Sequence, residues 1–247
     1  MVKLKPINRR EAALYLGYGK NEPDEVIRNL MDECEGPLME ACHPAFSYGV
    51  FDILTCSEEK IVLSECTLTL TGKDIGKLLR GCTKAVLFAA TLGSGVDALL
   101  RKLQITNMPK ALLTDAMAGA AIEQICNDFQ EELQGRFPTM QQTMRYSPGY
   151  GDLPLELQRE LLVTLEAGKR IGLSVTESNM LTPLKSVTAI IGLRDIEEEE
   201  RLSRIKDALG AGADFTAELS VGNCGKEACT GCAFAGKCHK GDNKEQE

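Results

Sequence analysis

Residues 145–193 read RYSPGYGDLPLELQRELLVTLEAGKRIGLSVTESNMLTPLKSVTAIIGL, and this stretch decides the fold. Its first ten residues are rich in turn formers. Pro148 and Pro154 fix the backbone angle φ, and the glycines between them permit positive φ. Arg145 and Tyr150 flank this exposed backbone with a guanidinium that can bind a carboxylate and a ring that can stack. We therefore expect residues 145–154, here called the lip loop, to border a ligand.

Regular elements are predicted directly behind the lip loop. Leucines at helical spacing predict a helix over residues 155–167, with Gly168 as its left-handed cap. Apolar and small or polar residues alternate over 171–176, which indicates a strand. Residues 186–193 are rich in β-branched side chains and predict a buried strand. The order is loop, helix, turn and strand.

The same stretch carries an ordered set of chemically distinctive residues. They are Arg145-x-x-x-Gly149-Tyr150, then Ile171-Gly172, Thr176-Glu177-Ser178, Met180, Pro183 and Ser186-Val187. This order resembles the reactivation (activation) domain of cobalamin-dependent methionine synthase. The resemblance implies an α+β fold over residues 1–209, in which short, mainly antiparallel strands pack with helices. We expect a small Cys-rich appendage over residues 210–247.

The resemblance also implies a function. Members of that family bind S-adenosylmethionine and donate its methyl group to a corrinoid whose cobalt has been oxidised to Co(II). Carried over residue by residue, Arg145 would bind the ligand carboxylate and Glu123 the ammonium and sulfonium. The backbone of Ser147 and Gly149 and the ring of Tyr150 would bind the adenine. Because methyl transfer from a sulfonium is a displacement, no general base is expected, and the protein positions the reactants.

The partners expected from the resemblance are other proteins. No corrinoid-carrying module precedes the domain in this sequence, so we expect the cobalamin or other corrinoid on a separate methionine synthase or methyltransferase, with a further protein as electron donor. Two features depart from the family: no residue matches its N-terminal acid, and its aromatic residues after the last strand are missing. Two alternatives stay open, a non-catalytic docking partner of a corrinoid protein and an iron-sulfur redox protein with a vestigial nucleotide groove.

Hydrophobic periodicity predicts the remaining elements. Helices are expected over residues 8–17, 22–42, 74–79, 93–103 and 110–133, and strands over 46–54, 61–63, 67–71 and 85–90. An acid-rich helix is expected over 194–206. The TLGSG turn at 91–95 lacks the Lys-Ser or Lys-Thr of a phosphate-binding loop, so we give it a structural role.

The helix expected over residues 110–133 has an unusual middle. Small residues cluster over 116–121, which predicts that another element packs close against it. Asp115, Gly119 and Glu123 lie at i, i+4 and i+8, so the two carboxylates are about 12 Å apart across a glycine gap. Either a cationic ligand lies in that gap or both acids are solvated; the resemblance favours a ligand role for Glu123.

Composition excludes several classes of protein. The net charge of −8, from 36 acidic and 28 basic side chains without a dense basic tract, argues against nucleic acid as a partner. No apolar run reaches eighteen residues and no signal peptide is visible, so we expect no membrane partner and a cytoplasmic location.

The ten cysteines fall into two groups. Six are scattered and are expected to be small core residues: Cys34, Cys42, Cys56, Cys66, Cys82 and Cys126. The other four, Cys224, Cys229, Cys232 and Cys238, lie within a glycine-rich segment. Four soft ligands this close favour an iron-sulfur cluster, with zinc and then free thiols as the alternatives. An iron-sulfur cluster would suit the supply of a low-potential electron to cobalt.

Overall fold

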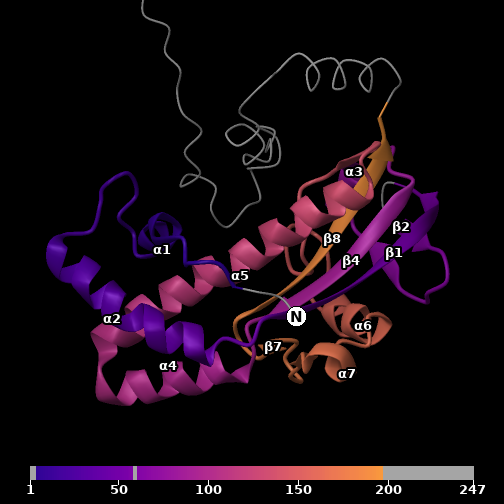
Figure 1. Cartoon of the computed structure of the whole chain (residues 1–247). Helices are drawn as coiled ribbons and strands as arrows, with labels where there is room; N and C mark the ends of the chain where they lie inside the picture. Colours follow the sequence, from indigo (N-terminus) through magenta and orange to yellow (C-terminus); the bar gives the residue numbers. More distant parts are fainter. Residues whose placement is uncertain (1–3, 58–59, 197–247) are drawn as a thin grey trace, which may run out of the picture.

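The protein is built on a six-stranded antiparallel sheet with helices on both faces (Figure 1). The computed structural model describes residues 4–57 and 60–196. The strand order is β3-β2-β1-β4-β8-β5. These strands are β1 (Ala45–Cys56), β2 (Lys60–Leu63), β3 (Thr69–Thr71), β4 (Lys84–Thr91), β5 (Met140–Gln142) and β8 (Ser186–Asp195). A separate two-stranded hairpin is formed by β6 (Ser174–Val175) and β7 (Leu181–Thr182).

Alternation of side chains on the central strands divides the apolar core into two layers. In β4, Val86 and Phe88 point to one layer, whereas Ala85 and Leu87 point to the other. Because both faces are covered, β4 is an almost continuous apolar run, as expected for a strand buried on both sides.

Each layer is covered by its own helices. The first face is covered by α1 (Arg9–Tyr15), α2 (Glu25–Ala41), α4 (Ser94–Thr106) and α5 (Met108–Arg136), and α5 runs along the sheet beside β8 (Figure 1). The second face is covered by α3 (Lys73–Leu78), α6 (Leu157–Thr164) and α7 (Ala167–Ile171). The predicted α+β class with antiparallel strands is confirmed.

The small residues of α5 permit close packing, as predicted. Ala118, Ala120 and Ala121 have no exposed surface, and the buried Ala12 of α1 lies in the same core layer. Further along α5, the ring of Phe129 stacks on that of Phe88 of the sheet with centroids 4.2 Å apart. This packing fixes α1 and α5 as neighbours, which positions the site described below.

The glycines of the 91–95 turn have the structural role that we expected. A Cβ atom on Gly95 would lie 2.4 Å from the carbonyl oxygen of Ala41, so only glycine permits the end of α2 to meet the start of α4. Gly93 has a φ of +87°, and its N–H donates to Oγ1 of Thr91.

Four details of the sequence prediction are corrected. Glu166, with a φ of 49°, breaks the helix expected over 155–167, and Gly168 lies inside α7 instead of capping it. The strand expected over 171–176 shrinks to Ser174–Val175 because α7 continues to Ile171. Arg194 and Asp195 belong to β8 and not to the acid-rich helix, whose other residues from 197 lie outside the described part of the chain. Strand β5 was not predicted.

Candidate ligand-binding site

Arg145 ties the segment after β5 to the middle of α5. Its Nη2 atom donates to Oε2 of Glu123 at 2.9 Å, and Nη1 donates to Oδ1 of Asn127 at 2.8 Å and also to the side-chain oxygen of Gln130. The backbone of the next residue, Tyr146, pairs with β8 and fixes the point from which Arg145 extends. The Arg145 side chain is 20% exposed and that of Glu123 is 34% exposed. The structure therefore joins two of the predicted site residues in a half-buried ion pair.

Helix α1 adds two residues that the sequence analysis missed. The hydroxyl of Tyr15 donates to Oε1 of Glu11 at 3.3 Å. The Tyr15 ring lies against Gly119 of α5, where a Cβ atom would be 3.4 Å from ring carbon Cδ2. Both residues interact electrostatically with the Glu123–Arg145 pair. We call Glu11, Tyr15, Glu123 and Arg145 the α1–α5 cluster.

Charge in the α1–α5 cluster is unbalanced. Burial raises the pKa of Glu11, and the neighbouring Glu123 raises it further, while the Tyr15 hydroxyl and Arg145 act in the opposite direction. Burial, followed by the charges of Glu123 and Glu11, also raises the pKa of Tyr15, so its phenol stays neutral. Two carboxylates facing one guanidinium give the cluster a formal charge of about −1 when both are ionised. Such a cluster favours a ligand that carries a net positive charge.

The predicted gap between Asp115 and Glu123 is not an open slot. The ring of Tyr15 covers Gly119, and Asp115 pairs with Nζ of Lys185 at 2.9 Å. Each acid therefore has a cation of the protein as partner. Asp115 is 57% exposed beside a close contact between helices, which agrees with the alternative of a solvated acid, and the ligand role of Glu123 stays a prediction.

Backbone groups of the lip loop form hydrogen bonds with one another. The N–H of Gly149 donates to the carbonyl of Leu153 at 2.8 Å, and the N–H of Tyr150 donates to the carbonyl of Ser147 at 3.2 Å. Gly149 has a φ of +90°, which favours glycine. The Ser147 carbonyl keeps a second lone pair for a ligand, whereas the Gly149 N–H is already engaged.

The ring of Tyr150 and the side chain of Arg145 contact different parts of the protein. Its ring lies 6.4 Å, centroid to centroid, from that of Tyr146, which packs against the core layer under α3, α6 and α7. Arg145 points instead to α5 on the other layer. Arg145 and Tyr150 of the lip loop thus have different neighbours, and the structure brings Arg145 together with Glu123 but places Tyr150 apart from that pair.

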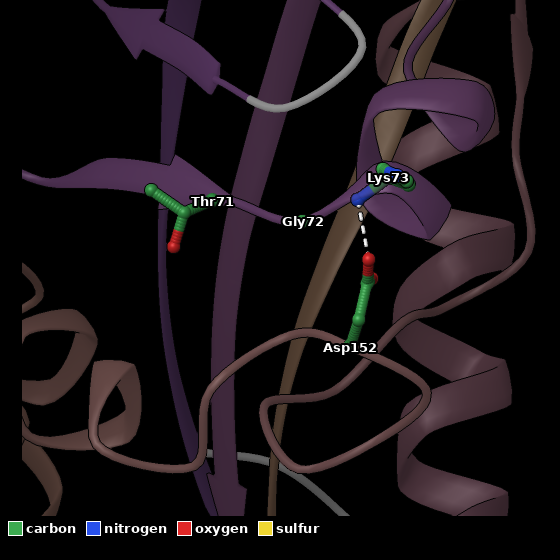
Figure 2. Close-up of a pocket in the computed structure, with 4 residues that line it drawn as sticks. All are labelled: Thr71, Gly72, Lys73 and Asp152. Atoms are coloured by element: carbon green, nitrogen blue, oxygen red, sulfur yellow. Dashed lines mark hydrogen bonds between the residues drawn. The ribbon is translucent and has the colours of Figure 1, made fainter.

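The lip loop is anchored to α3 by Asp152. Figure 2 shows its carboxylate accepting from the backbone N–H of Lys73; the distance is 2.6 Å, and the N–H of Asp74 donates at 3.1 Å. Burial tends to raise the Asp152 pKa, but these hydrogen bonds bring it below its usual value. A Cβ atom on Gly72 would lie 2.7 Å from the same carboxylate. An open hollow of about 290 Å³ is lined by Thr71, Gly72, Lys73 and Asp152.

This hollow and a second one do not coincide with the α1–α5 cluster. The second, of about 280 Å³, lies between α6, α7 and β6. Neither is lined by Arg145, Glu123 or Tyr150. The Thr176–Ser178 turn next to β6 closes on itself, because Oγ1 of Thr176 accepts the N–H of Met180 at 3.1 Å.

Half of the six cysteines in the described residues are buried core residues. Cys34, Cys82 and Cys126 are buried, as expected, whereas Cys42 and Cys66 are partly exposed and Cys56 is exposed. Burial raises the pKa of Cys126 to about 12. Within residues 4–57 and 60–196, no group of three or more His, Cys, Asp or Glu side chains could hold a metal ion. The cluster of Cys224, Cys229, Cys232 and Cys238 lies outside this part of the chain.

None of the described helices combines the length and apolar character needed to span a bilayer.

Comparison with known proteins gives a match in structure but not in sequence. No protein-family model matches the chain, and no curated protein matches it significantly. Among solved structures, the crystal structure of the MetH reactivation domain bound to AdoHcy is similar, with a TM-score of 0.62 and 15% sequence identity. The match covers 83% of this chain and 81% of that domain. At this identity the likeness establishes the fold, and the chain has the fold of the methionine synthase reactivation domain.

Proposed function

We propose that this protein binds S-adenosylmethionine at the α1–α5 cluster and supports the reductive remethylation of a corrinoid held by a separate methyltransferase. The observation that carries the proposal is the half-buried Glu123–Arg145 pair with Glu11 beside it. The fold supports the proposal, because a reactivation domain of the same fold has been crystallised with AdoHcy, the product of methyl donation.

The charges of the cluster suit this ligand. S-adenosylmethionine carries a carboxylate, an ammonium and a sulfonium, so its net charge of about +1 complements a cluster of about −1. The ligand carboxylate would take the guanidinium of Arg145, and the ammonium would lie between Glu123 and Glu11. Glu11 would then supply the N-terminal acid for which the sequence offered no match.

Arg145 must change some of its contacts to bind a carboxylate. Two of its acceptors are the neutral amide oxygens of Asn127 and Gln130. A charge-assisted bidentate bond to a carboxylate is stronger than a bond to an amide, so the exchange is favourable. The adenine would extend along the lip loop, where the Ser147 carbonyl and the Tyr150 ring offer an acceptor and a stacking face, and Gly149 keeps the turn that presents them.

The chemistry that this binding would serve is a displacement. One electron from a donor protein reduces Co(II) of the corrinoid to Co(I), whose electron pair attacks the methyl carbon of the sulfonium. The carbon–sulfur bond breaks, the methyl group stays on cobalt, and neutral AdoHcy leaves. The task of this protein is to hold the methyl group in line and exclude water, so no proton transfer is assigned to its side chains.

Methyl transfer to cobalt tests the proposal. The full-length protein is mixed with a Co(II)-corrinoid methyltransferase, a low-potential reductant and S-adenosylmethionine labelled in its methyl group. Label on cobalt that depends on this protein is the expected result. Label that appears equally without it would contradict the proposal.

The proposal assigns the C-terminal cysteines to electron supply. Cys224, Cys229, Cys232 and Cys238 would hold an iron-sulfur cluster, with zinc as the alternative. Anaerobic purification followed by iron and sulfide analysis tests this assignment. Colourless protein with stoichiometric zinc would remove the electron-transfer role but leave ligand binding untouched.

One observation favours a second candidate function. Three α5 side chains already accept hydrogen bonds from Arg145, as they would in a protein that uses this arginine only to fix its fold. Such a protein would dock on a corrinoid protein without binding the nucleotide. It would give no heat with S-adenosylmethionine, whereas our proposal predicts binding.

A further inference from the structure

Tyr15 occupies a distinctive place in the α1–α5 cluster. Its ring carbons Cδ2 and Cε2 lie 3.4 and 3.5 Å from the position that a Cβ atom would take on Gly119. Gly119 is one helical turn before Glu123 on α5. The residue nevertheless remains 44% exposed, so the ring is held against the helix without being covered by it.

The ring is also fixed in orientation. The Tyr15 hydroxyl donates to Glu11 four residues earlier on α1, at 3.3 Å. Because burial raises its pKa, the phenol keeps its proton over the whole neutral range and can donate this hydrogen bond there. The groups that face the ring are Glu11 from its own helix and Glu123 and Arg145 from the neighbouring elements. A neutral aromatic face is thus held beside two carboxylates and one guanidinium.

The sulfonium of the proposed ligand would come close to this ring. In S-adenosylmethionine, two methylene groups separate the sulfur from the α-carbon that carries the carboxylate and ammonium. With those groups on Arg145 and Glu123, the sulfur lies within roughly 5 Å, or one turn of α5, of the pair. Gly119 lies one turn of α5 before Glu123, and the Tyr15 ring lies against Gly119. An aromatic face attracts a cation within about 6 Å of its centroid.

We infer that Tyr15 is a specificity-determining residue, whose ring receives the sulfonium through a cation–π contact and thereby favours S-adenosylmethionine over AdoHcy. The inference rests on the proposed function, since it concerns the same ligand. AdoHcy has the same carboxylate, ammonium and adenosyl groups but a neutral thioether, so only the sulfonium contact distinguishes the two. Preference for the methyl donor over its product would keep the site from being blocked after transfer.

Binding constants for both ligands test the role of Tyr15. Calorimetry of the full-length protein gives a selectivity ratio, the Kd for AdoHcy divided by the Kd for S-adenosylmethionine. Tyr15→Phe keeps the aromatic face, and we expect its ratio to stay within about twofold of the wild-type value. Tyr15→Leu removes it, and we expect the ratio to fall between about twofold and thirtyfold. Leu14→Ala, which alters the exposed neighbour on α1, should leave the ratio unchanged.

The outcomes separate this inference from the proposed function. An unchanged ratio in Tyr15→Leu, with both ligands still bound, would overturn the role of Tyr15 and leave the proposed function standing. Absence of binding of either ligand to the wild-type protein would overturn both. If Tyr15→Leu does not fold, Tyr15→Gln provides the second test, because it also removes the aromatic face and suits a residue that is 44% exposed. A ratio that does not fall in Tyr15→Gln would then contradict the inference.

Discussion

Two arginine–glutamate ion pairs of this protein are almost equal in length but differ in their setting. Arg145 and Glu123 are 2.9 Å apart, and Arg170 and Glu166 are 2.8 Å apart. The first pair joins α5 to a segment 22 residues away and is 20% and 34% exposed. The second lies four residues apart at α7 and is 58% and 51% exposed. The distance is therefore no guide to function; the surroundings are what differ.

The surroundings of the first pair are polar and convergent. Arg145 has two further acceptors on α5, and α1 places Glu11 and Tyr15 beside it. Arg170 gives both of its bonds to the same oxygen of Glu166 on its own short segment. A pair that holds two distant segments together and keeps extra polar groups beside it can bind a zwitterion, whereas an exposed local pair is solvated.

The largest expected difference between the pairs is in stability. Arg145→Ala leaves the side-chain oxygens of Glu123, Asn127 and Gln130 without their donor, and we expect it to lower the free energy of unfolding by about 1–2 kcal/mol. Partial exposure of Glu123 keeps the loss below that of a fully buried pair. Arg170→Ala should be nearly neutral. Urea denaturation of both variants measures the difference, and equal losses would contradict this view of the two sites.

A double-mutant cycle sharpens the comparison by isolating each pair. For Arg145 and Glu123 we expect a coupling free energy of about 1 kcal/mol, because neither group is fully hydrated. The pair on α7 should give no measurable coupling, as is common for exposed pairs. A larger coupling on α7 than on α5 would reverse our ranking of the sites.

The smallest expected effect is a pH dependence of opposite sign at the two sites. The pKa of Glu11 is raised, so this group stabilises the fold when protonated, and that contribution is lost as the pH rises through the raised pKa. Glu11→Gln should therefore increase the Tm at pH 7 by about 1–2 °C, with a smaller gain near pH 3.5. Arg170 lowers the pKa of Glu166, so its contribution is present above the usual pKa of about 4.5 and is lost as the pH falls. Glu166→Gln should thus lower the Tm slightly at pH 7 only, and thermal melts at both pH values check both signs.

Local patterns predicted most of the described fold. The apolar spacing along α5, the apolar run of β4 and the β-branched residues of β8 are signals that lie within one segment, and these elements form close to where we expected them. Strand β5 was missed because Met140–Gln142 contains no β-branched residue; it forms by pairing with β8. The break at Glu166 was missed because a left-handed non-glycine residue has no marker in the sequence.

The candidate site was only partly visible from the sequence. The resemblance to the reactivation family singled out Glu123 and Arg145, which the structure joins. Glu11 and Tyr15 were missed because more than a hundred residues separate them from α5's Glu123, and only the packing of α1 on the small residues of α5 unites them. The one sequence signal for these two residues was their spacing: Glu11 and Tyr15 are four apart, which places both on one face of a helix, next to the buried Ala12. The ligand roles of Ser147, Gly149 and Tyr150 remain predictions.

Calorimetry with S-adenosylmethionine tests the central claim most directly. The wild-type protein and Arg170→Ala, which removes the arginine of the exposed pair, should bind with equal affinity. Arg145→Ala should bind at least tenfold more weakly, because the ligand carboxylate loses a charge-assisted hydrogen bond worth about 1.5–3 kcal/mol. Absence of heat with the wild-type protein, or equal binding by all three proteins, would contradict the account.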